Sequence, residues 1–318
     1  MVLLIGGVKV DEIPTDSRSL YHMYPHLKET ASQVASTPPK QIGPVGLLYV
    51  SQREFGVCSP HDKNIAIMGT DDCTTCLAVV LRHPTTGAVA VGHFEAICVD
   101  GITSMLSRIQ DLSLGYFEQG PVHMHLVGSF GDSRGYSEDV IFSLLQYVSK
   151  EPCEVELVTA CIGQLNTIIR GDTPWPILYG VGINIKTGEI FPATFPDKGP
   201  DLPLRHSRIF SGSPALLEIY DYQSCLLRIG PFHYEPLRCA NIMLQESDEF
   251  ILQHLTTSPE VEPAHIVNEI KNTLRHIQEH PFPEITIFTD NRPRYYRKEE
   301  TGQWTLVRLD PFRYESTN

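Results

Sequence analysis

Alternating hydrophobic and polar positions predict short strands along the N-terminal part of the chain. The opening MVLLIGGVKV predicts a first strand that turns at Gly6 and Gly7. Two apolar runs within 176–195 flank the turn KTG and predict a hairpin, with glycine supplying the positive φ that the turn needs. Further strands are predicted over 46–58, 64–70, 121–130 and 154–163.

Apolar residues spaced three and four positions apart predict helices elsewhere. Helices are expected over 17–36, 102–112, 136–150, 246–257 and 263–280. Pro25 interrupts the first, which should begin with Ser17 or Ser19 near its N-terminal cap, and Ser137 is expected to cap the third. Near the C-terminus, the pattern predicts a strand pair over 214–221 and 224–232 and short strands over 284–290 and 305–310.

These elements predict a single α+β domain over residues 1–318, with mixed sheets and flanking helices. Hydrophobic residues make up 42% of the 318 residues, so the chain can bury a large core. The loop 192–205 is rich in proline and marks the best place for a minor boundary.

The net charge of −13 argues against a nucleic-acid partner, because no stretch carries the basic run that phosphate binding needs. An acidic chain suits a cationic ligand instead, such as the ammonium group at a peptide's N-terminus. No segment approaches the roughly 18 consecutive apolar residues of a membrane span, and the opening lacks the features of a signal peptide, so we expect no membrane partner.

Eight scattered cysteines predict free thiols in a reducing compartment. We therefore expect a cytoplasmic location, with a nuclear one as an alternative. The chain is expected to act as a monomer without a metal or other cofactor.

The stretch GTDDCTTCLAVVLRHPTTGAVAVGHFE (69–95) carries the candidate chemistry. After Cys76 an apolar run predicts a strand, HPTTG turns the chain, and a second run over 88–99 returns to His93. A hairpin of this kind can place the two side chains together, as a cysteine nucleophile and its base require. Backbone N–H groups of the turn at 69–72 can stabilise a developing oxyanion.

Other interpretations of this stretch remain open at this point. Cys76 can equally be a small core residue, and Cys73-x-x-Cys76 matches half of a redox or zinc motif. Asp71 and Asp72 can bind a substrate's ammonium group or simply cap the turn. Further along, 121–130 places two histidines on one strand face, where they are either ligands or solvated side chains.

Five segments, spread over almost the whole chain, resemble the protein N-terminal asparagine amidohydrolases of eukaryotes: IGPVGLLYVSQRE, GTDDCTTCLAVVLRH, MHLVGSF, YGVGINIKTGEI and LTTSPEVEPAHIVNEIK. The resemblance implies hydrolysis of the side-chain amide of an N-terminal Asn in peptides and proteins, giving Asp and ammonia. It also implies that the product enters the N-degron route, where arginylation leads to ubiquitin-dependent degradation. The family's nucleophile falls on Cys76, and Cys73, where mammalian members carry alanine, receives no role.

The chain is more distantly similar to the superfamily of bacterial chemoreceptor glutamine deamidases and Rho-deamidating toxins. There a threonine precedes the catalytic cysteine and a histidine follows on the returning strand, and Thr70, Cys76 and His93 fall at matching offsets. This similarity implies an α-β-β sandwich core. It also implies that Thr70 holds the imidazole of His93 in place.

The implied mechanism passes through a thioester on Cys76, with His93 as the base that takes the thiol proton. The substrate's α-ammonium group needs an anionic partner, and Asp72, Asp71 and Glu95 lie closest in sequence. Two other functions stay open: a deamidase of protein glutamine or internal asparagine, and a catalytically inactive binding or scaffold protein on the same fold.

Overall fold

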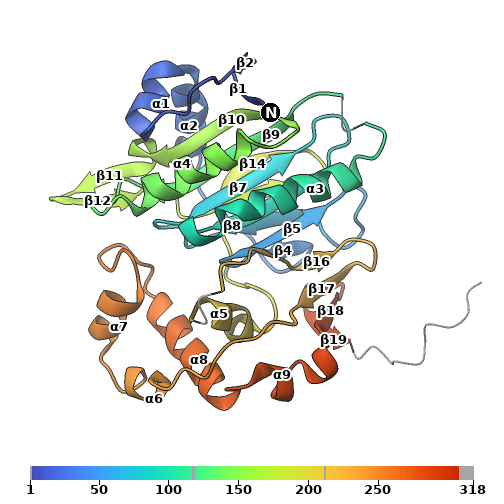
Figure 1. The fold of residues 1–318 in the computed structure, drawn as a ribbon, viewed down its shortest axis with the longest axis vertical. Helices are drawn as coiled ribbons and strands as arrows, with labels where there is room; N and C mark the ends of the chain where they lie inside the picture. Colours follow the sequence, from blue (N-terminus) through green and yellow to red (C-terminus); the bar gives the residue numbers. More distant parts are fainter. Residues whose placement is uncertain (1, 117–118, 211–212, 308–318) are drawn as a thin grey trace, which may run out of the picture.

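The computed structural model describes residues 2–116, 119–210 and 213–307 (Figure 1). A large sheet crosses the molecule, and helices lie on one of its faces (Figure 1). Its strands run in the order β15 (Leu217–Glu218), β5 (Glu54–Cys58), β8 (Val89–Phe94), β7 (Leu77–Arg82), β9 (Val122–Phe130), β10 (Glu154–Gly163), β1 (Val2–Ile5) and β2 (Val8–Lys9). The sheet is mixed, because β7 runs antiparallel to β8 and β9 whereas β9, β10 and β1 are parallel.

The two faces of the large sheet pack against different layers, as the alternation along β7 requires. Leu77, Val79 and Leu81 point into a buried cluster with α3 (Ile102–Leu112) and α4 (Tyr136–Val148). Ala78 and Val80 point the other way, into a cluster shared with a small sheet. That sheet has the order β3 (Lys40–Gln41), β14 (Ile190–Thr194), β13 (Val181–Asn184), β6 (Ile67–Thr70) and β4 (Leu47–Tyr49).

The layers therefore follow the order helices, sheet, sheet, and the predicted α+β fold is confirmed. The predicted break at Pro25 is also found, between α1 (Ser17–Met23) and α2 (His26–Ser36). The hairpin around KTG is formed by β13 and β14. The connections are η1 (Ala96–Gly101), η2 (Gln164–Asn166) and the hairpin of β11 (Thr167–Arg170) with β12 (Thr173–Pro176).

The C-terminal part packs below the two sheets in Figure 1. Its helices are α5 (Leu202–Phe210), α6 (Ala240–Met243), α7 (Asp248–Leu255), α8 (Ile266–Glu279), α9 (Pro283–Thr286) and η3 (Thr289–Asn291). A further sheet joins β16 (Tyr220–Asp221), β17 (Leu226–Ile229), β18 (Arg294–Lys298) and β19 (Trp304–Val307). None of the helices in the described ranges is long and apolar enough to cross a membrane.

Four local predictions were wrong or incomplete. The predicted strand 284–290 is the short helix α9 followed by η3, because Pro283 occupies the first helical turn and the packing of Phe288 against Phe232 decides the conformation. The predicted strand 46–58 divides into β4 and β5, which belong to different sheets. The returning strand over 88–99 ends at Phe94, where η1 begins. The last predicted strand, 305–310, is found as far as Val307, and the rest lies outside the described residues.

Ser17 lies next to the cap of α1 as predicted, whereas the prediction that Ser137 caps α4 was wrong, and carboxylates accept the hydrogen bonds at the starts of both helices. Asp16 caps α1, where it accepts a hydrogen bond from Ser19 N at 2.8 Å. Helix α4 begins after Gly135, and Asp132 accepts from Ser137 N at 2.8 Å. Carboxylates are favoured at these positions because they complement the partial positive charge of a helix N-terminus.

A buried ion pair attaches the C-terminal part to the sheets. Arg205 of α5 is 1% exposed and donates to Glu54 of β5 at 3.0 and 2.6 Å. The same guanidinium donates to the carbonyl oxygens of Tyr49 and Lys198 at 3.0 and 2.7 Å. The contacts with Glu54 and Tyr49 are buried away from water, so these groups depend on one another for their hydrogen bonds.

We expect Arg205→Met to lower the free energy of unfolding by about 3–5 kcal/mol, because it leaves the Glu54 carboxylate buried without its counter-charge. Denaturant unfolding with a comparison of midpoints measures the effect. The matched control is Arg108→Met, which removes an exposed pair with Glu218 and should cost about 1 kcal/mol or less. Equal losses in both variants would contradict the role of the buried pair.

Candidate active site

The hairpin of β7 and β8 brings Cys76 and His93 to the same face of the large sheet. Ala78 of β7 lies directly opposite His93 of β8. Cys76 precedes Ala78 by two positions, and side chains two positions apart in an extended chain share a face. That face packs against the small sheet, and both Cys76 and His93 line a cavity there.

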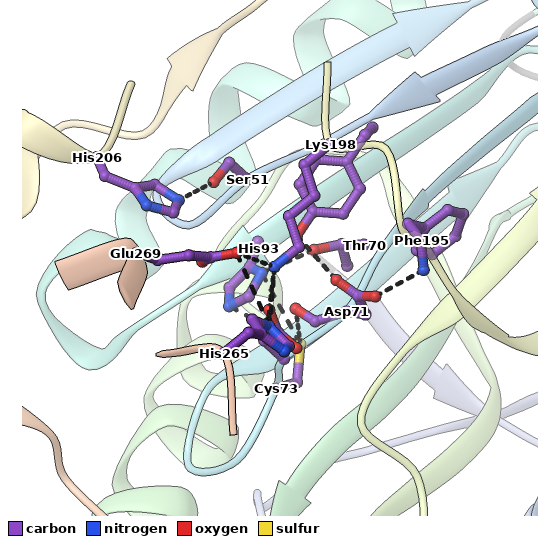
Figure 2. Close-up of polar contacts among 12 residues, drawn as sticks. Ser51, Thr70, Asp71, Cys73, His93, Phe195, Lys198, His206, His265 and Glu269 are labelled. Carbon is purple, nitrogen blue, oxygen red and sulfur yellow. Dashed lines mark hydrogen bonds and ion pairs between the residues drawn. The ribbon is translucent and has the colours of Figure 1, made fainter. Parts of the chain in front are cut away.

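Thr70, at the end of β6, contacts the histidine from the opposite sheet (Figure 2). Its Oγ1 lies 2.7 Å from His93 Nδ1. Both residues are buried, with His93 only 3% exposed, so water does not compete strongly for this hydrogen bond. The contact fixes the plane of the ring and commits Nδ1, which leaves Nε2 for another partner.

Cys73 is the second thiol near the histidine. Its Sγ lies 3.9 Å from His93 Nδ1 and 3.8 Å from Nε2 (Figure 2). Cys73 is fully buried and does not line the cavity, whereas Cys76 is partly exposed to it. A ligand in the cavity can therefore reach Cys76 but not Cys73. This difference favours Cys76 as the reactive thiol.

Burial keeps both members of the pair neutral. Burial lowers the pKa of His93 to about 4, so the imidazole carries no charge at pH 7. Burial, followed by the charge of Glu95, raises the pKa of Cys76 well above its usual value. At rest the Cys76 thiol and the His93 imidazole are therefore both neutral, and no preformed thiolate–imidazolium pair exists.

Gln52, on the loop between β4 and β5, is a site residue that the sequence patterns did not reveal. Its side-chain amide nitrogen lies 3.7 Å from Cys76 Sγ and also hydrogen-bonds Glu95. The loop crosses from the small sheet to the large one, and Arg53 has a φ of 58° where the chain turns. The break in the predicted strand 46–58 is what places Gln52 over the thiol.

The three carboxylates proposed for substrate binding already have partners within the protein. Asp71 accepts from Tyr49 OH at 2.9 Å and from Phe195 N at 2.8 Å (Figure 2). Glu95 accepts from Arg53 Nε at 2.8 Å and from its Nη2 at 2.7 Å. These two groups contribute to the walls of the cavity, but their oxygens are occupied.

Asp72 belongs to a charged cluster with Lys198, His265 and Glu269 (Figure 2). Burial would raise the pKa of Asp72, but the hydrogen bond from His265 and the charge of Lys198 outweigh it and hold the pKa at about 2. The donor atoms of Asp72, His265 and Glu269 lie within 4.8 Å of one another, as in a metal site. However, the Lys198 ammonium lies 2.8 Å from Glu269 and 3.2 Å from His265, so a cation already neutralises the cluster.

The cavity of about 420 Å³ is closed by segments distant in sequence. Cys76, His93 and Gln52 line it together with neighbouring residues of the N-terminal part, which include Asp71 and Glu95. The lining residues from position 198 onward are Lys198, His206, Ile209, Phe210, Leu255, Thr256, Thr257, Glu262, Ile266, Glu269, Ile270 and Thr273. This volume accommodates a small molecule or the end of a peptide chain.

An α+β sandwich with a thiol, an imidazole and an orienting hydroxyl at one cavity is typical of enzymes that hydrolyse amides. Comparison with known proteins agrees: a family model described as protein N-terminal asparagine amidohydrolase matches residues 37–306. The chain belongs to this family.

Relatives with that name occur in animals and plants. Those from Sus scrofa and Homo sapiens are each 38% identical over 308 residues, which cover 96% of this chain and 98% of theirs. The relative from Arabidopsis thaliana is 28% identical over 280 residues, 81% of this chain and 80% of its own.

The raised pKa of Cys76 predicts slow alkylation at neutral pH. A thiol whose pKa lies above its usual value is mostly protonated at pH 7, so iodoacetamide should modify Cys76 more slowly than an unstructured cysteine peptide. The rate should rise continuously through pH 9. Peptide mapping by mass spectrometry identifies the modified residue, and a rate that levels off below about pH 8 would show a lowered pKa instead.

Proposed function

We propose that this protein hydrolyses the side-chain amide of an N-terminal asparagine in peptides and proteins, producing aspartate and ammonia. The observation that supports the proposal is that Cys76 and His93 both line one cavity in a chain of the protein N-terminal asparagine amidohydrolase family. Cys76 is the proposed nucleophile and His93 the proposed base.

The chemistry begins with proton transfer within the neutral pair. If Nδ1–H of His93 donates to the Thr70 hydroxyl, Nε2 keeps a free lone pair and accepts the Cys76 proton as sulfur attacks the amide carbon. The attack forms a carbon–sulfur bond and places negative charge on the amide oxygen. His93 then returns the proton to the leaving nitrogen, ammonia departs, and a thioester remains.

Water completes the reaction from the same position. His93 takes a proton from a water molecule that attacks the thioester carbon, and the carbon–sulfur bond breaks to release the aspartate carboxyl and restore the thiol. The amide nitrogen of Gln52, which contacts Cys76 Sγ, is a suitable donor to the oxyanion in both steps. Backbone N–H groups around Cys76 are the other proposed donors.

The wider role follows from the product. An N-terminal aspartate is the chemical form that the N-degron route arginylates, so we propose that the reaction commits its substrates to ubiquitin-dependent degradation. This role requires protein partners with a free N-terminal Asn in the cytoplasm, and also in the nucleus if the enzyme is present there.

Replacing the nucleophile should abolish turnover. Cys76→Ala is expected to reduce ammonia release from an Asn-initiated peptide by at least about 10³-fold, because the thioester cannot form. Mass spectrometry should show a gain of about one mass unit at the first residue with the wild-type chain only. The matched control, Cys73→Ala, should remain close to wild type although Cys73 also contacts His93.

Activity of Cys76→Ala at the wild-type rate would refute the assignment. Gln-initiated peptides and peptides with internal Asn provide the specificity controls. Preference for either would indicate a different deamidase, and no turnover of any peptide would favour a binding or scaffold function.

Thr70 is proposed to position the base, which a pair of variants can test. Thr70→Val keeps the size of this buried side chain but removes the hydroxyl, so kcat should fall about 10-fold or more because the His93 ring is no longer held. Thr70→Ser restores the hydroxyl and should recover most of the rate. If both variants have equal kcat, the hydrogen bond has no part in catalysis.

A further inference from the structure

The proposed substrate carries a positive charge close to the reacting carbon. In an N-terminal asparagine the α-ammonium group is separated from the side-chain amide carbon by only two further carbons. A carboxylate that pairs with the ammonium must therefore lie beside the thiol, because the attacked carbon approaches sulfur to about 3–3.5 Å. An unpaired carboxylate at this distance would distinguish a free N-terminus from an internal residue.

Most acidic side chains of the cavity are already paired. Asp72 and Glu269 bind Lys198, and Glu95 binds Arg53. The remaining acidic residues of the cavity wall are Asp71, whose oxygens accept from Tyr49 OH and Phe195 N, and Glu262.

Glu262 differs because its partners are all neutral groups: two hydroxyl groups and the backbone N–H of Ser258. Its Oε1 accepts from Ser258 Oγ at 2.8 Å and from Thr74 Oγ1 at 3.2 Å. No lysine, arginine or histidine among the described residues forms an ion pair with it. Burial raises the pKa of this carboxyl group, as expected for a charge that is partly removed from water without a cation.

The segment that carries Glu262 contacts the two residues that precede Cys76. Thr74, which contacts Glu262, precedes Cys76 by two positions, and Thr75 Oγ1 lies 2.7 Å from Thr257 Oγ1 of the same segment. The charge of Glu262 is close enough to contribute to the raised pKa of Cys76, after burial and Glu95. The carboxylate therefore belongs to the immediate surroundings of the thiol.

The carboxylate is also held in place before a substrate arrives. Val261 is buried, its N–H donates to Ser258 O at 3.0 Å, and its carbonyl accepts from Tyr179 OH at 3.1 Å. Two hydroxyl groups and one backbone N–H fix the carboxyl group, and none of them supplies a positive charge to it. A preorganised anion of this kind binds a cation without first giving up its own freedom of movement.

We propose that Glu262 binds the α-ammonium group of the substrate and makes the enzyme specific for asparagine at a free N-terminus. This inference rests on the proposed function, since it assigns one contact of that substrate. A substrate ammonium supplies the counter-charge that Glu262 lacks, whereas an internal or acetylated asparagine leaves the partly buried carboxylate unpaired.

The experiment compares two peptides that differ only in the ammonium group: one begins with Asn, and in the other hydrogen replaces the α-amine. The wild-type chain should hydrolyse the amine-bearing peptide with a kcat/KM about 100-fold higher, the size expected for a desolvated charge pair. In Glu262→Gln this ratio should fall to within a few-fold of one. The ratio tests pairing with the ammonium group, because a general structural defect would lower kcat/KM for both peptides by the same factor and leave the ratio unchanged.

Glu260→Gln is the matched control, because Glu260 is exposed two positions earlier in the same segment and lies outside the cavity. It should keep the wild-type ratio. Glu262→Asp, which keeps the charge on a shorter side chain, should give an intermediate ratio and provides a second test if Glu262→Gln does not fold. Thermal unfolding verifies that each variant is folded.

The outcomes separate the two proposals. If the wild-type chain releases ammonia from neither peptide, the proposed function fails and the inference fails with it. If the wild-type chain strongly prefers the amine-bearing peptide and folded Glu262→Gln or Glu262→Asp keeps that preference in full, the function stands and the role of Glu262 is overturned. Loss of the preference in Glu262→Gln alone, with Glu260→Gln unchanged, supports the inference.

Discussion

A hydrogen bond between two sheets organises the candidate site. Thr70 ends a strand of the small sheet and His93 lies on the large one, and their side chains meet at 2.7 Å in the buried layer between the sheets. The contact exists only if both sheets pack at the correct distance and register. The orientation of the His93 ring therefore depends on how the two sheets pack. The hydrophobic clusters on the two faces of the large sheet hold the candidate site in place.

Burial that stabilises this arrangement also determines its chemistry. The layer between the sheets excludes water, so His93 and Cys76 are held neutral. In the proposed mechanism, the thiolate therefore forms only as it attacks a substrate. Charges around the cavity are mostly matched within the protein, through Lys198 for one cluster and Arg53 for Glu95. Because these carboxylates are paired with cations, few of them can attract a cationic ligand. Glu262 differs from them because no cation among the described residues forms an ion pair with it.

The sequence predicted the elements whose formation depends on neighbours in the chain. Strand β7 and the helices α3 and α8 have strong periodicity and were found close to their predicted bounds, and β8 begins where it was predicted although it ends earlier, at Phe94. Predictions failed where packing decides between two local possibilities. Segment 284–290 has strand-like residues but folds as α9, and 46–58 has the alternation of one strand but supplies strands to two sheets.

By itself, the sequence determined that Cys76 and His93 would lie on one face of a hairpin, because a short turn makes their relative position a local property. The resemblance to known families added the prediction that Thr70 holds the imidazole of His93. Only the tertiary structure decided which side chains surround the thiol. Gln52 arrives on a loop between sheets, and Glu262 arrives from a segment far along the chain. Contacts between distant segments depend on how completed elements pack, and no pattern of neighbouring residues records that packing.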